Sequence, residues 1–362
     1  MKVKIRFRLP SLSGIRALSL WARTRGCRRE SMRLAVFGAG GMGATHASAY
    51  AAFGKKERVE IAGIVSRSAS KARGLAKRVD APWFTDPQKI LRDESIDAID
   101  VTTPSGLHRP LVVLALAQGK HVFCETPVAL TLRDADAMIN AARVNRRILM
   151  VAQVMRFVAD YQRAHEEAAS GSLGKPRIVV ARRLARPYWS AKRPRPFRVY
   201  GDPIVELSIH DFDVANWILG RPRSVLARGI SGSTGMTEHA MVAVEYRGGS
   251  AFIEGSAMMP PGFPFTTALR VQCDAGVFDH VTEFRGGPIP KTRSVRYTKH
   301  GLETVPVRGH DPYTEECRLF VRTVRRKADG KLLSPDAERD ALRVALAARE
   351  SISRGREIDL AA

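Results

Sequence analysis

The chain has 362 residues, 44% of them hydrophobic, which favours two globular domains with full cores over a disordered chain. It contains no run of 18 apolar residues, so we expect no membrane-spanning helix. The net charge of +23 comes without any basic patch interleaved with aromatic residues. We therefore predict a basic solvated surface and no specific nucleic-acid partner.

The four cysteines are too scattered to form a metal or disulfide framework. Cys27, Cys124, Cys273 and Cys317 include no Cys-x-x-Cys pair, and the histidines show no metal-ligand spacing. We expect no metal site, and a reducing, cytoplasmic location.

Residues 1–31 differ in composition from the rest of the chain. They hold nine basic residues and one acidic residue, with only a short apolar stretch around Ala17–Trp21. This resembles a transit peptide or a weak signal sequence, but Met32 directly precedes the first predicted strand. We expect a basic extension that is disordered or lies upstream of the true start.

Residues 32–155 alternate between short apolar runs and helical patterns. We predict strands at 33–38, 59–66, 96–103, 121–124 and 147–154, with helices at 42–53, 68–79, 107–118 and 132–145 between them. Such alternation is typical of a doubly wound parallel sheet covered by helices on both faces.

From residue 156 onward the pattern changes to paired strands. Turns at Gly248-Gly249, near residue 275 and at His300-Gly301 separate three pairs of apolar runs, which predicts successive hairpins. Two helices follow, at 313–327 and 335–353. We predict an α+β domain over 156–334 with a large, mostly antiparallel sheet. The last segment, 335–362, is expected to pack back on the first domain.

A glycine-rich loop joins the first predicted strand to the first helix. Gly38-Ala39-Gly40-Gly41-Met42-Gly43 has the spacing G-x-G-x-x-G in the strand–turn–helix context that gives this motif its meaning. Gly38 permits the tight turn, Gly40 a close approach of pyrophosphate, and Gly43 close packing of the helix. We predict that these six residues bind a dinucleotide at a helix N-terminus.

The end of the second strand bears on the choice of dinucleotide. It runs into Ser66-Arg67-Ser68 and carries no acidic residue to bind the adenosine ribose. An arginine here can pair with a 2′-phosphate, so NADP is favoured, with NAD as the alternative.

Three further motifs, in order, resemble the superfamily of glucose–fructose oxidoreductase, inositol dehydrogenase and MocA. Thr103-Pro104 is followed by His108, the stretch 119–127 (GKHVFCETP) resembles the family's AGKHVxxEKP, and 206–220 (ELSIHDFDVANWILG) resembles its acid-x-x-x-His-x-x-Asp helix. The last stretch is most similar to inositol dehydrogenases. The resemblance implies a nicotinamide cofactor in contact with Thr103, Pro104, His108, Glu125, Thr126 and Pro127. It also implies a homodimer or homotetramer.

Two positions depart from the family pattern. Thr126 stands where dehydrogenases of the family usually have lysine, and Glu206 stands where they usually have aspartate. A threonine hydroxyl is a weak donor near neutral pH and cannot replace an ammonium group. We expect Thr126 to hydrogen-bond the substrate or a water.

Proton transfer is assigned to one helix. Glu206 and His210 have i, i+4 spacing, so a continuous helix would place both on one face, with Asp213 close by. We predict that His210 takes or gives the hydroxyl proton, that Glu206 orients it, and that the carboxylate raises its pKa. Arg156, Tyr188, Trp189 and Asp213 are the predicted substrate-binding residues.

The sequence thus predicts an NAD(P)-dependent oxidoreductase that acts on a secondary alcohol, or its ketone, in a polyol, inositol or sugar-like substrate. Two alternatives remain. One is a non-catalytic NADP-binding sensor of the same fold, which the missing lysine would fit. The other is a reductase of a different substrate that needs no lysine.

Overall fold

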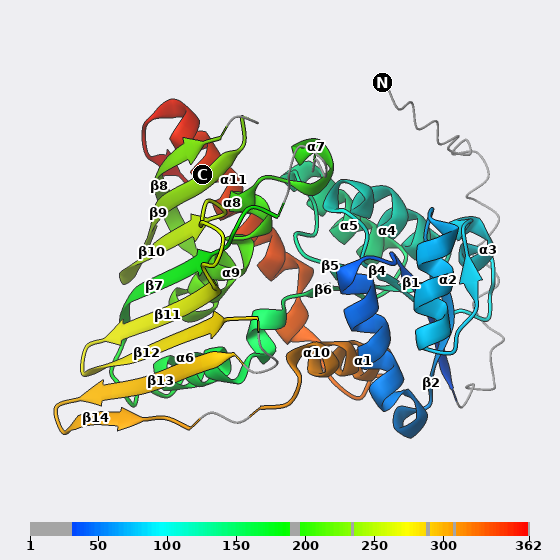
Figure 1. The fold of residues 1–362 in the computed structure, drawn as a ribbon, viewed down its shortest axis with the longest axis horizontal. Coiled ribbons are helices and arrows are strands. Elements are labelled where there is room, and N and C mark those ends of the chain that lie inside the picture. Colours follow the sequence, from blue (N-terminus) through cyan, green and yellow to red (C-terminus); the bar gives the residue numbers. More distant parts are fainter. Residues whose placement is uncertain (1–30, 189–195, 233–234, 287–289, 307–308, 361–362) are drawn as a thin grey trace.

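The structure is a computed structural model that describes residues 31–188, 196–232, 235–286, 290–306 and 309–360. Two domains lie side by side, and the helices near the C-terminus run between them (Figure 1). Residues 1–30 of the predicted basic extension and Trp189 lie outside the described residues. In the described part of the chain, no helix is both long and apolar enough to cross a membrane.

The first domain is the predicted doubly wound parallel sheet covered by helices, which is a Rossmann fold. Its six parallel strands are ordered β3-β2-β1-β4-β5-β6. They are β1 (Met32–Phe37), β2 (Val59–Val65), β3 (Trp83–Phe84), β4 (Ala98–Val101), β5 (His121–Glu125) and β6 (Leu149–Ala152). The helices are α1 (Gly41–Glu57), α2 (Ala69–Arg78), α3 (Pro87–Leu91), η2 (Ser105–Leu107), α4 (His108–Ala117) and α5 (Leu132–Val144). β4 and β6 are buried along their whole length, as expected of strands covered on both faces.

The second domain carries a nine-stranded sheet ordered β14-β13-β12-β11-β7-β10-β9-β8-β15. Its strands are β7 (Pro176–Leu184), β8 (Pro222–Ser231), β9 (Thr237–Tyr246), β10 (Gly249–Ser256), β11 (Phe265–Cys273), β12 (Gly276–Phe284), β13 (Lys291–Thr298), β14 (Gly301–Thr304) and β15 (Ile358–Asp359). The three predicted hairpins are confirmed as β9–β10, β11–β12 and β13–β14. Within this second sheet, only the β7–β10 pair is parallel among the described residues.

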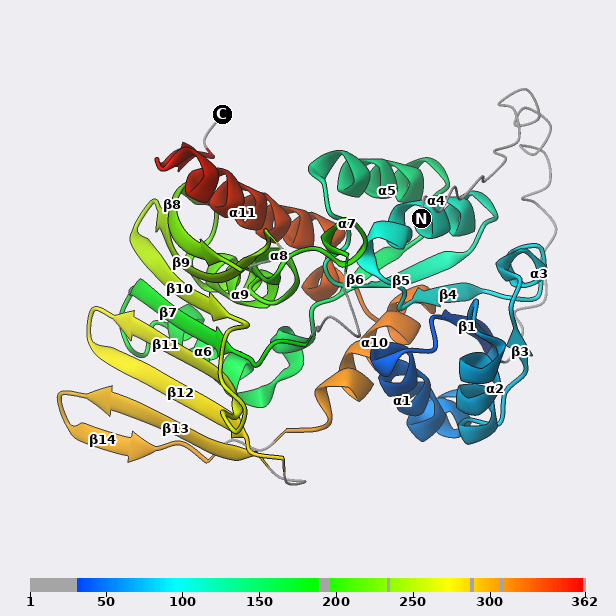
Figure 2. The same cartoon turned by 45° about the horizontal axis from the view of Figure 1, so that its top comes forward.

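One face of this sheet is covered and the other is open. Helices α6 (Ala159–Ser170), α8 (Pro203–Glu206), α9 (Ile209–Leu219) and α11 (Pro335–Arg354) lie between the sheet and the Rossmann domain (Figure 2). The short elements η3 (Val154–Phe157), α7 (Phe197–Tyr200) and η4 (Lys331–Leu333) link these parts. Val242 faces the helices and is 3% exposed, whereas Met241 beside it is 50% exposed. The sheet therefore has the alternation typical of a one-sided core.

The two C-terminal helices contact both domains. The helix that packs along α1 of the Rossmann domain is α10 (Pro312–Val324). Helix α11 touches α5 and β6 there, but its main partners are α9 and β8 of the second domain. The reason is its long buried stripe, including Leu342, Ala345 and Ala348, which completes the core beneath the nine-stranded sheet.

Candidate functional site

The glycine loop has the geometry that its spacing predicts. Gly38 has a φ of +130°, and a Cβ there would lie 2.5 Å from the carbonyl oxygen of Thr102. A Cβ on Gly43 would lie 2.1 Å from the carbonyl oxygen of Gly38, so only glycine lets α1 approach the turn so closely. By contrast, Gly40 and Gly41 face open space, because no atom lies within 4 Å of the point that a Cβ would occupy on either residue.

The same loop fits a dinucleotide. The N-cap residue of α1 is Gly40, which has no side chain to cap the helix and so leaves its first backbone N–H groups for an anion. The hydroxyl oxygen of Thr103, just after β4, is buried and has no hydrogen-bond partner among the described residues. Arg67 is exposed between β2 and α2, while Ser68 caps α2 by accepting a hydrogen bond from the Lys71 backbone N–H. These residues line the carboxyl edge of a parallel sheet, where such folds bind ligands.

His108 was predicted to touch the cofactor, but its side chain is fully enclosed. Its ring nitrogens lie 2.6 Å from the carbonyl oxygen of Thr103 and 3.1 Å from that of Pro127. Burial lowers the pKa of this imidazole, although its contacts with these carbonyl oxygens oppose the shift. His108 therefore positions the loops after β4 and β5 relative to each other. The sequence could not show this, because the two loops meet only in the folded sheet.

Thr126 is connected to the second domain by a buried hydrogen-bond network. Its hydroxyl donates to Oε1 of Glu338 in the first turn of α11, and the backbone N–H of Val128 donates to the same oxygen at 3.3 Å. The Gln153 side-chain amide donates to Oε2 of Glu338 at 3.3 Å and to Oδ1 of Asp213 at 2.6 Å. Sequence reasoning missed Glu338 and Gln153, because neither belongs to a recognisable motif.

Asp213 and Arg156, which were predicted to bind substrate, bind each other. The Arg156 guanidinium donates two hydrogen bonds to the Asp213 carboxylate, at 2.7 and 2.9 Å, and both side chains are buried. The same guanidinium lies over the ring of Trp217, 5.3 Å from its centroid. The pair therefore joins η3 to α9, and the substrate-binding role of the two residues stays a prediction.

The predicted carboxylate–imidazole helix is not continuous. Glu206 ends α8, and α9 begins after the cap residue Ser208, so the two side chains do not share one regular helix face. Glu206 accepts a hydrogen bond from the Tyr188 hydroxyl at 3.1 Å. The prediction that a carboxylate raises the His210 pKa is wrong, because burial and the charge of Arg183 lower it to about 3. His210 is thus a neutral, half-buried imidazole.

A second buried cluster lies under the Rossmann sheet. His46 on α1 is 0% exposed, with Nδ1 2.9 Å from Asp100 and Nε2 3.0 Å from Glu125. Burial alone would lower its pKa, but Asp100, Cys317 and the contact with Glu125 together outweigh burial and raise the pKa well above the usual value. Glu316 and Cys317 of α10 complete the cluster. Because both ring nitrogens of His46 face carboxylates, a protonated imidazole donates to Asp100 and to Glu125 and so holds this cluster together. The other oxygen of Glu125 accepts the Thr126 backbone N–H at 3.0 Å.

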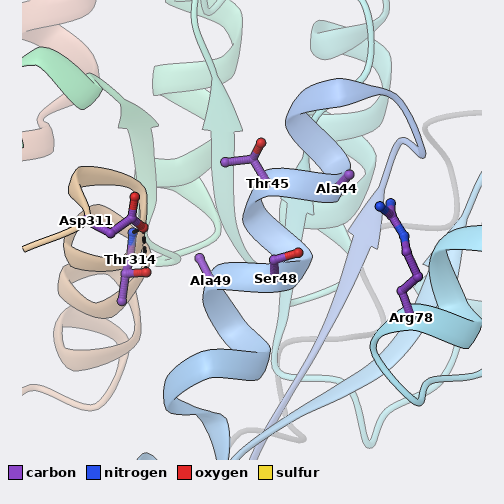
Figure 3. Close-up of a pocket in the computed structure, with 7 residues that line it drawn as sticks. All are labelled: Ala44, Thr45, Ser48, Ala49, Arg78, Asp311 and Thr314. Carbon is purple, nitrogen blue, oxygen red and sulfur yellow. Dashed lines mark hydrogen bonds between the residues drawn. The ribbon is translucent and has the colours of Figure 1, made fainter. Parts of the chain in front are cut away.

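The structure also has a shallow cavity of about 440 Å³ on the outer side of α1. Figure 3 shows it between α1, the end of α2 and the start of α10, with Thr45 and Ser48 on one side and Asp311 on the other. None of the predicted site residues lines it. Asp311 is already used to cap α10 through the backbone N–H of Thr314. We assign no role to this cavity.

The fold and the glycine loop define a two-domain oxidoreductase with an NAD-binding Rossmann domain. Comparison of the sequence with known families confirms this: residues 32–153 match the oxidoreductase family with an NAD-binding Rossmann fold, and residues 161–279 match the GFO/IDH/MocA C-terminal domain. The chain belongs to the Gfo/Idh/MocA family.

Characterised relatives span nearly the whole chain. The sequence is 27% identical to myo-inositol 2-dehydrogenase of Thermotoga maritima, over 91% of this chain and 98% of that protein. It is 24% identical to scyllo-inositol 2-dehydrogenase (NAD(+)) of Bacillus subtilis, over 91% and 97%. The aldose-aldose oxidoreductase structure from Caulobacter crescentus has a TM-score of 0.80 at 20% identity, over 91% and 100%, which shows a shared fold.

Proposed function

We propose that this protein transfers a hydride between a nicotinamide dinucleotide and a secondary alcohol, or the corresponding ketone, in an inositol, another polyol or a sugar-like compound. The family and the two inositol dehydrogenases named above support the reaction class. The nicotinamide supplies or accepts the hydride, and the protein binds, orients and exchanges the hydroxyl proton.

NADP(H) is the proposed cofactor. Arg67 is exposed at the end of β2, and no acidic residue stands in the Ser66-Arg67-Ser68 turn to repel a 2′-phosphate. Guanidinium groups bind phosphate through two parallel hydrogen bonds, and adjacent serine hydroxyls can add to that contact. This favours NADP(H) over NAD(H).

The substrate oxygen is proposed to lie between Thr126 and His210. One observation carries this proposal: the hydrogen-bond chain Thr126–Glu338–Gln153–Asp213 links the turn after β5 to α9, and His210 stands one helical turn before Asp213 on that helix. A neutral His210 can hydrogen-bond the reacting hydroxyl or carbonyl. Tyr188 and Glu206, already bonded to each other, are proposed to bind further hydroxyl groups of the substrate.

Assembly through the open sheet face is proposed as well. Leu226 and Phe252 flank Ala243 on neighbouring strands of that face, and they are 42% and 44% exposed. Apolar side chains grouped on a sheet face favour pairing with a second copy about a twofold axis. The proposed species is a homodimer or homotetramer.

The activity is tested by steady-state kinetics with NADPH and NADH against a panel of inositols, inosose ketones, polyols and sugars. We expect turnover with at least one secondary alcohol or ketone. His210→Ala is expected to lower kcat about 10²–10³-fold with little change in cofactor affinity, the range for the loss of one hydrogen bond to the reacting oxygen. His300→Ala, an exposed histidine in the β13–β14 turn, is the matched control. If no substrate turns over, or if both variants behave alike, the proposal fails.

A further inference from the structure

Glu338 is a buried carboxyl group that the sequence motifs do not explain. It lies in the first turn of α11 and is 1% exposed. Its hydrogen-bond partners are neutral: the Thr126 hydroxyl, the Val128 backbone N–H and the Gln153 side-chain amide. Removing a carboxylate from water without a cationic partner is costly, so this environment favours the protonated acid.

We propose that Glu338 acts through Thr126 as the proton reservoir of the reaction, so that the Thr126 hydroxyl donates to the substrate oxygen when Glu338 is protonated. This inference rests on the proposed function and assigns its proton source. Thr126 is half-buried at the carboxyl end of β5, whereas Glu338 is enclosed. The hydroxyl is therefore the end of the pair that a bound substrate can reach, in the place of the family's lysine.

The protonation state of Glu338 sets which way the Thr126 hydroxyl points. An ionised carboxylate can only accept, so the Thr126 proton is then directed at Glu338. A protonated carboxyl can donate to the Thr126 oxygen, which frees the threonine proton for the substrate. Because a hydroxyl both donates and accepts, this single side chain can pass a proton in either direction.

The reduction step balances in the following way. A bound reduced nicotinamide would supply the hydride that forms the new C–H bond at the carbonyl carbon, as the C=O π bond opens. The carbonyl oxygen takes the proton of the Thr126 hydroxyl, and the Thr126 oxygen takes the carboxyl proton of Glu338. Glu338 is left as a carboxylate that water reprotonates after the product leaves. Alcohol oxidation follows the same path in reverse.

The electrostatic surroundings agree with this assignment. Burial, together with the negative charge of Asp213, raises the pKa of Glu338 to about 8, although its hydrogen bonds oppose the shift. The charged and titratable neighbours are Asp213 on α9, which pairs with Arg156 of η3, and Cys124 on β5. Asp136 on α5 pairs with Arg339 instead. At pH 7 Glu338 therefore holds a proton, while His210, with a pKa of about 3, does not.

The test compares wild type with Glu338→Gln, which keeps the shape and can still accept from Thr126. Glu350→Gln, on the exposed side of the same helix, is the control. We expect wild-type ketone reduction to fall above about pH 8, because the proton is lost from Glu338. Alcohol oxidation is expected to rise over the same range. Glu338→Gln is expected to reduce kcat about 100-fold and to flatten both limbs.

A second readout does not need turnover. Infrared difference spectroscopy of the holoprotein is expected to show a protonated-carboxyl band that titrates near pH 8. This carboxyl band is expected to be absent from the spectrum of Glu338→Gln and present in that of Glu350→Gln. An active wild type whose pH profile and carboxyl band survive Glu338→Gln would overturn the inference and leave the proposed function intact. A titrating Glu338 band without turnover of any substrate would instead contradict the proposed function.

Discussion

Substitutions at two glycines of the same loop allow the effect on stability to be measured separately from the effect on cofactor binding. A Cβ on Gly43 would lie 2.1 Å from the Gly38 carbonyl oxygen and 2.9 Å from the Thr102 hydroxyl oxygen. The first of these is a backbone atom that cannot rotate away, so α1 must move off the turn. Overpacking of this kind costs about 1–3 kcal/mol, and we expect Gly43→Ala to fall at the upper end of that range. Cofactor binding is expected to be lost with it.

Gly40→Ala is the matched variant, because nothing lies within 4 Å of its Cβ position and its φ of −87° suits alanine. We expect its free energy of unfolding to stay within about 0.5 kcal/mol of wild type. The new methyl group would hold the pyrophosphate away from the helix N-terminus and weaken charge-assisted hydrogen bonds worth about 1.5–3 kcal/mol. That corresponds to a roughly 10–100-fold loss of NADPH affinity.

Chemical denaturation and calorimetry with NADPH measure the two effects. Wild-type affinity in Gly40→Ala would refute the placement of pyrophosphate against this loop. Wild-type stability in Gly43→Ala would refute the close packing of α1 on Gly38.

Two further predictions concern cofactor choice and assembly. Arg67→Ala is expected to weaken NADPH binding by about 1.5–3 kcal/mol and to leave NADH binding nearly unchanged. The control is Lys77→Ala, exposed at the other end of α2, which is expected to change the binding of neither dinucleotide. Tighter binding of NADH than of NADPH by the wild type would show that Arg67 does not select the cofactor. Phe252→Glu on the open sheet face is expected to shift the protein toward monomer in light scattering at micromolar concentration, and a wild type that is already monomeric there would contradict pairing through this face.

The Rossmann domain was the most predictable part of the molecule. Its strands are short, continuous apolar runs, and the glycine loop fixes where β1 ends and α1 begins. The three hairpins were also predictable, because each has a turn between apolar runs. Strand β7 was not predicted, since it pairs with β10 and β11, which lie far along the chain. Local sequence carries no signal for such pairings.

The candidate site was harder to predict than the fold. The i, i+4 spacing of Glu206 and His210 assumed one helix, but the chain restarts its helix at Ser208, which packs against Gly255 of β10. The partner of Thr126 lies 212 residues away in α11. Residue spacing predicts which side chains are neighbours on one helix or strand, whereas this network joins four parts of the fold through tertiary contacts.

The central claim is hydride transfer to or from a secondary carbon, and isotope transfer tests it most directly. NADPH deuterated at the transferable C4 position of the nicotinamide is incubated with the enzyme and the ketone that gives the fastest NADPH oxidation, and the product alcohol is analysed by mass spectrometry and NMR. We expect one deuterium on the new CH–OH carbon, with little transfer by His210→Ala. Oxidation of NADPH without deuterium in the product, or transfer unaffected by His210→Ala, would contradict the account.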